Sequence, residues 1–162
     1  MTRSRRRDAR PEKIVSGGQS GVDRAALDVA AELSLLRGGW CPRGRYAEDG
    51  PISDFYPLTE TPSPATAQRT EWNVRDADGT LVLTEGEPSG GTAVTIRFAR
   101  RHGKPCLVVD LEEGPEPGAV GRWIAEHRIA VLNVAGPRES KRPGIYRRAG
   151  AFLRDALAPP KK

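Results

Sequence analysis

Three short segments rich in glycine carry the side chains best suited to chemistry in this chain of 162 residues. They read Gly17-Gly18-Gln19-Ser20-Gly21, Gly86-Glu87-Pro88-Ser89-Gly90-Gly91-Thr92 and Gly136-Pro137-Arg138-Glu139-Ser140. Because glycine has no Cβ, the backbone N–H groups around it can come close to a phosphate. Serine and threonine hydroxyls add donors, and the guanidinium of Arg138 adds a charged donor that can make two parallel hydrogen bonds. The residue types therefore indicate a site for a phosphate-bearing anion.

Each of these segments alone is also explained by a tight turn that packing requires. The first lacks the glycine spacing of the dinucleotide-binding fingerprint, and none contains the Gly-Lys-Ser/Thr of a Walker loop. Their shared position is more informative, since each follows an apolar, strand-like run and precedes a helix or a helix-like segment. We therefore predict that Ser89, Gly90, Gly91 and Thr92 of the second segment join the first and third segments in one site.

Three further polar residues are candidates for the same site. Asp23 falls in the first turn of a predicted helix, where it either complements the helix dipole or contacts a hydroxyl or amine of the ligand. Arg69 and Asn73 are four residues apart, so they share one face of a predicted helix. A solvated helix face is the alternative, but the segment leads toward the sheet edge and we include both residues in the predicted site.

The sequence offers no spacing that indicates a metal site or a nucleophilic triad. The histidines and cysteines do not fall at metal-ligand spacings, and Cys41 and Cys106 are expected to be structural. We assign no catalytic and no metal-binding residue. A non-catalytic binding protein is the favoured interpretation, with an enzyme as the open alternative.

The elements that must position these residues alternate along the chain. Apolar spacing predicts strands and helices over residues 13–16 (strand), 22–33 (helix), 66–76 (helix), 80–84 (strand), 92–102 (helix), 105–111 (strand), 120–127 (helix), 129–134 (strand) and from 143 onward (helix). Gly38-Gly39 is expected to stop the first helix. Residues 39–65 contain five prolines and form either a functional cover or a locally folded excursion.

This order predicts an α/β fold, a Rossmann-like three-layer sandwich with a mostly parallel sheet and helices on both faces. Continuous apolar strands separated by helices are typical of parallel sheets buried on both sides. Loops that follow parallel strands meet at the carboxyl edge of the sheet, where open α/β sheets bind ligands. The three glycine-rich segments are expected at that edge.

The length and the charge distribution predict a single ligand-binding domain over residues 13–158, with tails at 1–12 and 159–162. The net charge is +5, but the excess of basic residues lies in the first 13 residues and in Lys161 and Lys162. A solvated, disordered basic tail is favoured over a nucleic-acid-binding arm. The apolar runs are too short to span a bilayer, and the basic N-terminus has no apolar stretch behind it, so a cytoplasmic location is expected.

Several blocks together resemble the family of molybdenum-cofactor carrier proteins. The blocks are residues 14–27, which contain Gly17-Gly18-Gln19-Ser20-Gly21-Val22-Asp23, residues 44–50, Arg69-Thr70-Glu71-Trp72-Asn73, Ser89-Gly90-Gly91-Thr92 and Asn133 to Ser140. The resemblance spans about residues 13–157. It implies a homo-oligomer that binds the molybdenum cofactor (molybdopterin), a pterin with a terminal phosphate. It further implies protection of that cofactor or its delivery to an acceptor molybdoenzyme.

The same resemblance extends to the lysine-decarboxylase-like cytokinin phosphoribohydrolases of the wider Rossmann-like superfamily, which share a Pro-Gly-Gly-x-Gly-Thr-x-x-Glu loop. Here the loop reads Pro88-Ser89-Gly90-Gly91-Thr92, and Thr95 stands in place of the glutamate. This departure argues against that hydrolase reaction. A nucleotide-binding or nucleotide-hydrolysing enzyme that uses Glu85, Glu87 or Glu139 stays open, as does a sensor whose N-terminal arm contacts nucleic acid.

Overall fold

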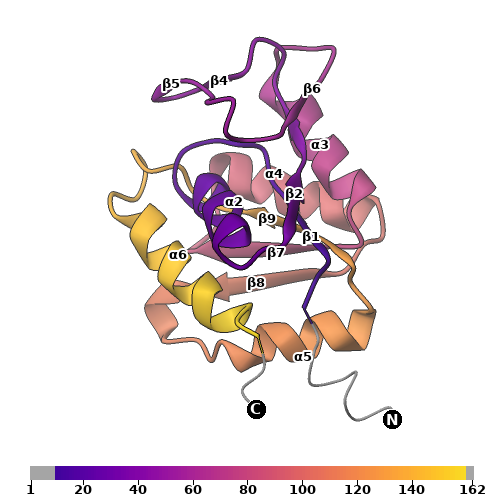
Figure 1. Ribbon diagram of the computed structural model, residues 1–162, viewed down its shortest axis with the longest axis vertical. Helices are drawn as coiled ribbons and strands as arrows, with labels where there is room; N and C mark the ends of the chain where they lie inside the picture. The colour runs from indigo at the N-terminus through magenta and orange to yellow at the C-terminus, as the bar shows by residue number, and fades with distance from the viewer. Residues whose placement is uncertain (1–9, 160–162) are drawn as a thin grey trace.

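A computed structural model describes residues 10–159 and contains a five-stranded, fully parallel sheet (Figure 1). The sheet order is β2-β1-β9-β7-β8. The strand bounds are β1 Lys13–Val15, β2 Leu36–Gly38, β7 Gly79–Thr84, β8 Cys106–Asp110 and β9 Val131–Ala135. The interior strand β7 is buried along its whole length, as expected of a parallel strand covered on both faces.

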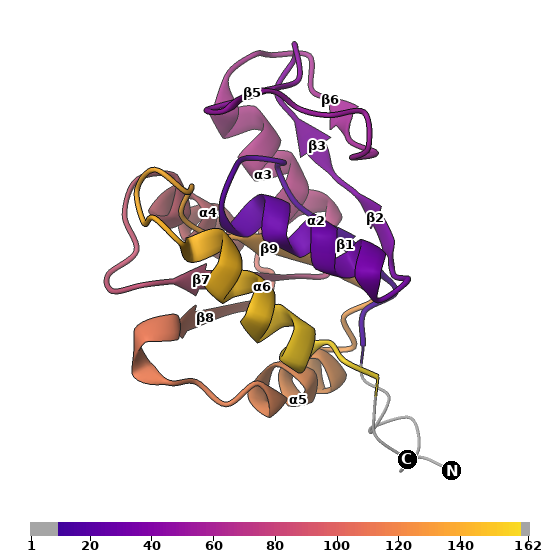
Figure 2. The same cartoon turned by 60° about the vertical axis from the view of Figure 1, so that its left-hand side comes forward.

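Helices cover both faces of this sheet, which confirms the predicted Rossmann-like fold. The helix bounds are α2 Val22–Glu32, α3 Thr66–Asp76, α4 Gly90–Arg101, α5 Gly118–His127 and α6 Ile145–Ala156, with a 3-10 turn at Leu111–Glu113. Helices α2, α5 and α6 share one apolar core with Leu81 and Leu83 of β7. Side chains alternate along a strand, so Thr80, Val82 and Thr84 face the side of α3 and α4. Figure 2 shows α2 and α6 packed side by side on the first face.

Most helices form where the apolar spacing predicts them. The buried face of α2 uses the predicted positions, and α3 has the predicted bounds. Helix α4 begins at Gly90, two residues before the predicted start at Thr92, and Gly103 follows it at φ 64°, the left-handed conformation that glycine favours. Helix α6 begins at Ile145 rather than at Pro143, because Gly144 adopts φ 89° before it.

Strand β2 is absent from the sequence prediction, and Gly38-Gly39 does not end the first helix. Helix α2 ends at Glu32, and Ser34 at φ 59° reverses the chain into β2. This strand pairs in parallel with β1, aligning Ile14 with Arg37. It has three residues and an exposed Leu36, so it lacks the alternation that signals a strand. Strand β8 was expected to be buried, but it forms the other edge of the sheet and leaves Val108 43% exposed.

Residues 39–65 form a locally folded excursion, one of the two predicted alternatives. Its short strands are β3 Trp40–Cys41, β4 Tyr46–Ala47, β5 Gly50–Pro51 and β6 Thr59–Glu60, where β3 pairs with β6 and β4 forms a hairpin with β5. A small second core consists of Leu27, Cys41, Ala47, Ile52 and Leu58. The excursion lies over one side of α2, which contributes Leu27 to this second core, and beside α3 in both views (Figures 1 and 2).

The described residues begin inside the predicted N-terminal tail. Arg10 donates a hydrogen bond to the carbonyl of Leu33 at 3.1 Å, and the N–H of Glu12 donates to the carbonyl of Ala130 at 2.8 Å. The rest of the predicted tails, residues 1–9 and 160–162, lies outside the described residues. Within residues 10–159, no helix combines the length and the apolar character needed to cross a membrane.

Candidate functional site

A cleft of about 450 Å³ opens at the carboxyl edge of the sheet and is lined by all three glycine-rich segments. The segments follow β1, β7 and β9, which are neighbours in the sheet, so the topology brings together loops that are far apart in the sequence. Eleven predicted site residues line the cleft: Gly17, Gln19, Asp23, Arg69, Asn73, Ser89, Gly91, Thr92, Gly136, Pro137 and Arg138. Six predicted residues lie outside its lining: Gly18, Ser20, Gly21, Gly90, Glu139 and Ser140.

The backbone N–H groups of the first glycine-rich segment are used within the protein. The N–H of Gly18 lies 3.4 Å from the hydroxyl of Ser16, to which it donates. The N–H of Gln19 donates to a carboxylate oxygen of Asp23 at 3.3 Å, and that of Ser20 donates to the side-chain carbonyl of Gln19 at 3.0 Å. Three of the five amides of this segment are therefore already paired where it forms part of the cleft wall.

Two glycines are required where the first and third segments pack against each other and against β7. Gly21 has φ 79°, and a Cβ there would lie 2.4 Å from the carbonyl oxygen of Pro137. The same carbonyl accepts a hydrogen bond from the N–H of Val22 at 3.2 Å. A Cβ on Gly136 would lie 2.2 Å from the carbonyl oxygen of Leu83. Glycine at these positions allows loops from separate strands to touch.

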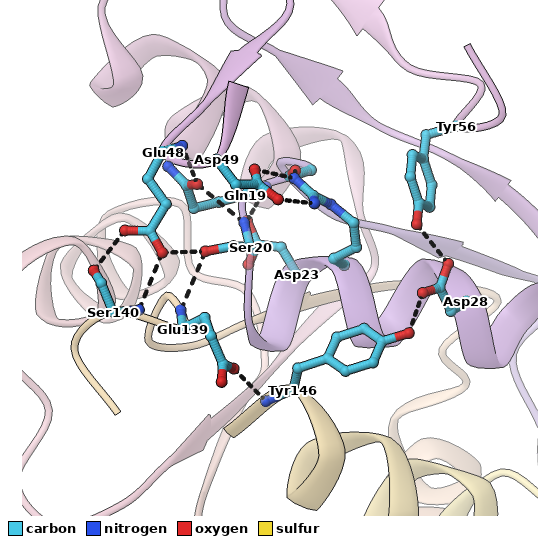
Figure 3. A network of polar contacts seen from close by, with 12 residues as sticks. Gln19, Ser20, Asp23, Asp28, Glu48, Asp49, Tyr56, Glu139, Ser140 and Tyr146 are labelled. Atoms are coloured by element: carbon cyan, nitrogen blue, oxygen red, sulfur yellow. Dashed lines mark hydrogen bonds and ion pairs between the residues drawn. The ribbon is translucent and has the colours of Figure 1, made fainter. Parts of the chain in front are cut away.

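Ser20 and Ser140, predicted as ligand donors, instead bind the carboxylate of Glu48 (Figure 3). Both hydroxyls lie 2.5 Å from Glu48 carboxylate oxygens, and the N–H of Ser140 lies 3.0 Å away. The Nε of Arg138 forms an ion pair with the same carboxylate at 3.4 Å. These donors hold the pKa of Glu48 below its usual value. Sequence reasoning left Glu48 out of the site, because nothing local marks its contacts with residues 28 and 92 positions away.

Glu139 serves the start of helix α6. Its carboxylate accepts hydrogen bonds from the N–H of Gly144 at 2.5 Å and from that of Tyr146 at 3.0 Å. A carboxylate at a helix N-terminus satisfies N–H groups that have no partner within the helix. In this arrangement the carboxylate of Glu139 is engaged at the helix start rather than in the cleft.

Asp23 is a buried carboxylic acid in the cleft wall. The residue is 8% exposed, and burial raises its pKa from 3.8 to about 6. The positive charge of Arg69 and the N–H of Gln19 oppose this shift but do not cancel it. A group with a pKa near 6 changes its charge close to neutral pH, so Asp23 can carry or accept a proton there.

Arg69 and Asn73 lie on the same face of α3, as predicted, and both are tied to the surrounding backbone. Arg69 donates to the carbonyl oxygen of Gly17 at 3.0 Å. The side-chain amide of Asn73 accepts from the N–H of Trp40 at 2.8 Å and donates to its carbonyl at 3.0 Å. Arg69 can still contribute charge to the cleft, whereas the main bonds of Asn73 join α3 to β3.

The second glycine-rich segment forms the most exposed part of the site. Ser89, Gly90 and Gly91 are exposed, α4 begins at Gly90, and Gly91 and Thr92 of its first turn line the cleft. The first N–H groups of a helix have no acceptor within the helix. A Cβ on Gly90 would lie 2.5 Å from Nζ of Lys141. The helix N-terminus and a nearby ammonium together favour an anion.

The cleft lining also contains residues outside the predicted set: Thr66, Thr70, Thr84, Glu85, Glu87, Thr95, Asn133, Val134, Ala135, Lys141 and Arg142. Lys141 and Arg142 directly follow the third segment, and this pair of basic residues was a signal available in the sequence. Glu85 is buried and receives two hydrogen bonds from Arg148, at 2.5 and 2.8 Å. In the part of the chain that the structure describes, no cluster of three or more His, Cys, Asp or Glu side chains is arranged for a metal ion.

Comparisons with known proteins agree with this architecture. The sequence model of the circularly permutated YpsA SLOG family matches residues 14–157. A crystal structure from Syntrophus aciditrophicus SB at 1.45 Å resolution, described as a "putative molybdenum carrier protein", is 45% identical. The match covers 91% of this chain and 96% of that chain, with a TM-score of 0.88. No curated protein sequence matches the chain. The family resemblance predicted from the sequence is confirmed, and the chain belongs to the circularly permutated YpsA SLOG family.

Proposed function

We propose that this protein binds the molybdenum cofactor, a phosphorylated pterin, in the cleft at the carboxyl edge of the sheet. The observation that carries the proposal is the gathering of Arg138, Lys141 and Arg142 in the lining that also contains the first turn of α4. Cationic side chains and free helical N–H groups are the donors that bind phosphate. The 45% identical structure, described as a molybdenum carrier, supports the choice of ligand.

The dimensions and polarity of the cleft fit such a ligand. Its volume of about 450 Å³ lies within the usual range for small-molecule sites. A Cβ on Gly91 would meet no atom within 4 Å, so this part of the wall leaves room for a phosphate to approach the backbone. The buried side chains of Asp23, Thr95 and Asn133 supply acceptors and donors suited to the amino, N–H and carbonyl groups of a pterin.

The family resemblance extends the proposal to the setting in which the ligand is held. We propose a cytoplasmic homo-oligomer, formed by one folded domain per chain, that protects the cofactor or delivers it to an acceptor molybdoenzyme. The buried cleft floor suits protection, because a bound ring there would be shielded from water. The predicted role is binding without chemical conversion of the cofactor.

We expect Arg138→Ala to weaken ligand binding by about 1.5–3 kcal/mol, the contribution of a hydrogen bond to a charged group. The protein is purified from cells that make the molybdenum cofactor, denatured, and assayed for pterin fluorescence and molybdenum. Arg97→Ala is the matched control, since Arg97 is an exposed arginine on α4 outside the cleft lining. Stoichiometric pterin in the wild type and the control but not in Arg138→Ala supports the proposal. Protein free of pterin in all three would rule out the molybdenum cofactor as the ligand.

Gly91→Ala is expected to reduce binding while leaving the fold intact. The added methyl group meets no protein atom within 4 Å, and alanine is a better helix former than glycine by up to about 1 kcal/mol. The methyl would instead obstruct close approach of a phosphate to the start of α4. Ligand titration and thermal unfolding of the same variant check this. Full affinity in Gly91→Ala would remove this turn from the site.

A nucleotide is the second candidate ligand, because the phosphate-binding features do not by themselves distinguish phosphorylated heterocycles. Glu85, Glu87 and Asp23 line the cleft and are the carboxyl groups a nucleotide hydrolase would need. Glu85 is engaged by Arg148, which leaves Asp23 as the carboxyl group best suited to proton transfer. Incubation with a panel of nucleoside monophosphates tests the hydrolase, and absence of released base across the panel would exclude hydrolysis of these nucleotides.

A further inference from the structure

Glu48 joins three parts of the chain that are separate in sequence. It lies at the tip of the β4–β5 hairpin, in the excursion formed by residues 39–65. Its carboxylate receives hydrogen bonds from Ser20 of the first segment and from Ser140 of the third, and it pairs with Arg138. Figure 3 shows Ser20 and Ser140 converging on the two carboxylate oxygens of Glu48. One acidic group therefore fixes two loops of the cleft relative to each other.

The hairpin that carries Glu48 is itself anchored. The N–H of Glu48 donates to the side-chain carbonyl of Gln19 at 2.8 Å, the same oxygen that accepts from the N–H of Ser20. The next residue, Asp49, accepts two hydrogen bonds from Arg24 at 2.7 and 3.1 Å. Ala47 is buried in the second small core. These contacts hold the hairpin, and with it the carboxylate of Glu48, in place.

The contacts of Glu48 reach the cleft through Arg138. The side chain of Arg138 is 48% exposed, and its Nε pairs with Glu48 while the residue lines the cleft. Arginine has five N–H donors in a rigid fork, so a carboxylate held at Nε leaves the terminal nitrogens available for an anion. An exposed arginine without such a partner would sample many rotamers and lose part of its binding energy to ordering.

We propose that Glu48 is a positioning residue, whose carboxylate holds Arg138 and the 136–140 loop in the arrangement that binds an anion. The proposal rests on the phosphate-binding role of the cleft but not on the identity of the heterocycle. It makes a prediction opposite to simple electrostatics. A negative charge near an anion site should repel the ligand, so neutralising it would tighten binding. Positioning requires that neutralising Glu48 weakens binding.

The test measures the affinity of the full chain for inorganic pyrophosphate by calorimetric titration. We expect Glu48→Gln, which keeps the size but loses the charge, to weaken pyrophosphate binding about tenfold, in line with the loss of a charge-assisted hydrogen bond. Tighter or unchanged binding in Glu48→Gln would overturn the proposal. Absence of pyrophosphate binding in the wild type would instead reject the phosphate site of the proposed function, and the positioning role with it.

A double-mutant cycle separates positioning from a general loss of structure. If Glu48 acts through Arg138, then Glu48→Gln should have little further effect in an Arg138→Ala background. Additive losses in the double variant would contradict action through Arg138. Ser140→Ala, which removes one hydroxyl donor to Glu48, provides a milder variant should Glu48→Gln fail to fold, and it is expected to weaken binding less than tenfold. Unfolding curves of every variant establish that the fold is retained.

Discussion

Gly136→Ala is expected to lower the free energy of unfolding by about 3 kcal/mol, because the new Cβ has no room. It would lie 2.2 Å from the carbonyl oxygen of Leu83 and 2.7 Å from a methyl group of Val22. The first contact is with backbone in the interior strand β7, which cannot turn away as a flexible side chain can. The φ of Gly136 lies outside the left-handed region, so the cost comes from the contacts alone.

Denaturation in urea measures this effect, and the matched control is Gly91→Ala in the same cleft. The control should unfold at the wild-type midpoint or slightly above it. A loss of about 3 kcal/mol corresponds to a fall in Tm of roughly 6–12 °C for a domain of this size. A Gly136→Ala protein as stable as the control would mean that loop 136–140 can shift away from β7, and that the packing of the cleft is looser than described.

Asp23→Asn is expected to stabilise the protein at pH 8 and to have little effect near pH 3.5. Burial raises the pKa of Asp23 from 3.8 to about 6, so the folded state binds a proton that the unfolded state has already released between these values. The corresponding stability is fully present below about pH 3.8 and is lost as the pH rises through about 6. A shift of about two units amounts to roughly 3 kcal/mol at 1.36 kcal/mol per unit. Asparagine carries no charge, so it avoids the loss of stability that a buried, ionised carboxylate causes at high pH. Its amide oxygen can still accept a hydrogen bond from the N–H of Gln19.

Unfolding free energies at several pH values between 3.5 and 8 provide the measurement. Asp49→Asn is a control of opposite sign, because Arg24 lowers the pKa of Asp49, and that stability is present at high pH and lost as the pH falls. Parallel pH profiles for the wild type and Asp23→Asn would show that Asp23 is not buried as described. A buried acid that lowers the stability of the fold when it is ionised, and that lies in the wall of a cleft, is typical of a group that serves binding or proton transfer.

Local patterns were sufficient to predict most of the elements. Helix α3 has the predicted bounds, and β7 begins one residue before the predicted strand, at Gly79. Such elements could be predicted because apolar spacing and the glycines at their ends act within a few residues. The edge strands are different, since β2 has three residues and an exposed Leu36, and only its pairing with β1 defines it as a strand.

The sequence by itself determined that three glycine-rich loops each follow a predicted strand and carry donors for an anion. It did not determine which donors face the cleft. The sequence predicts Ser20 and Ser140 as ligand donors, yet both hydroxyls bind Glu48. Lys141 and Arg142, which were not predicted, are part of the cleft lining. Only the tertiary structure decided this, because a hydroxyl group bonds to whichever acceptor folding places nearest. The acceptor here comes from a hairpin 28 residues from Ser20 and 92 residues from Ser140, a distance over which residue spacing carries no information about contact.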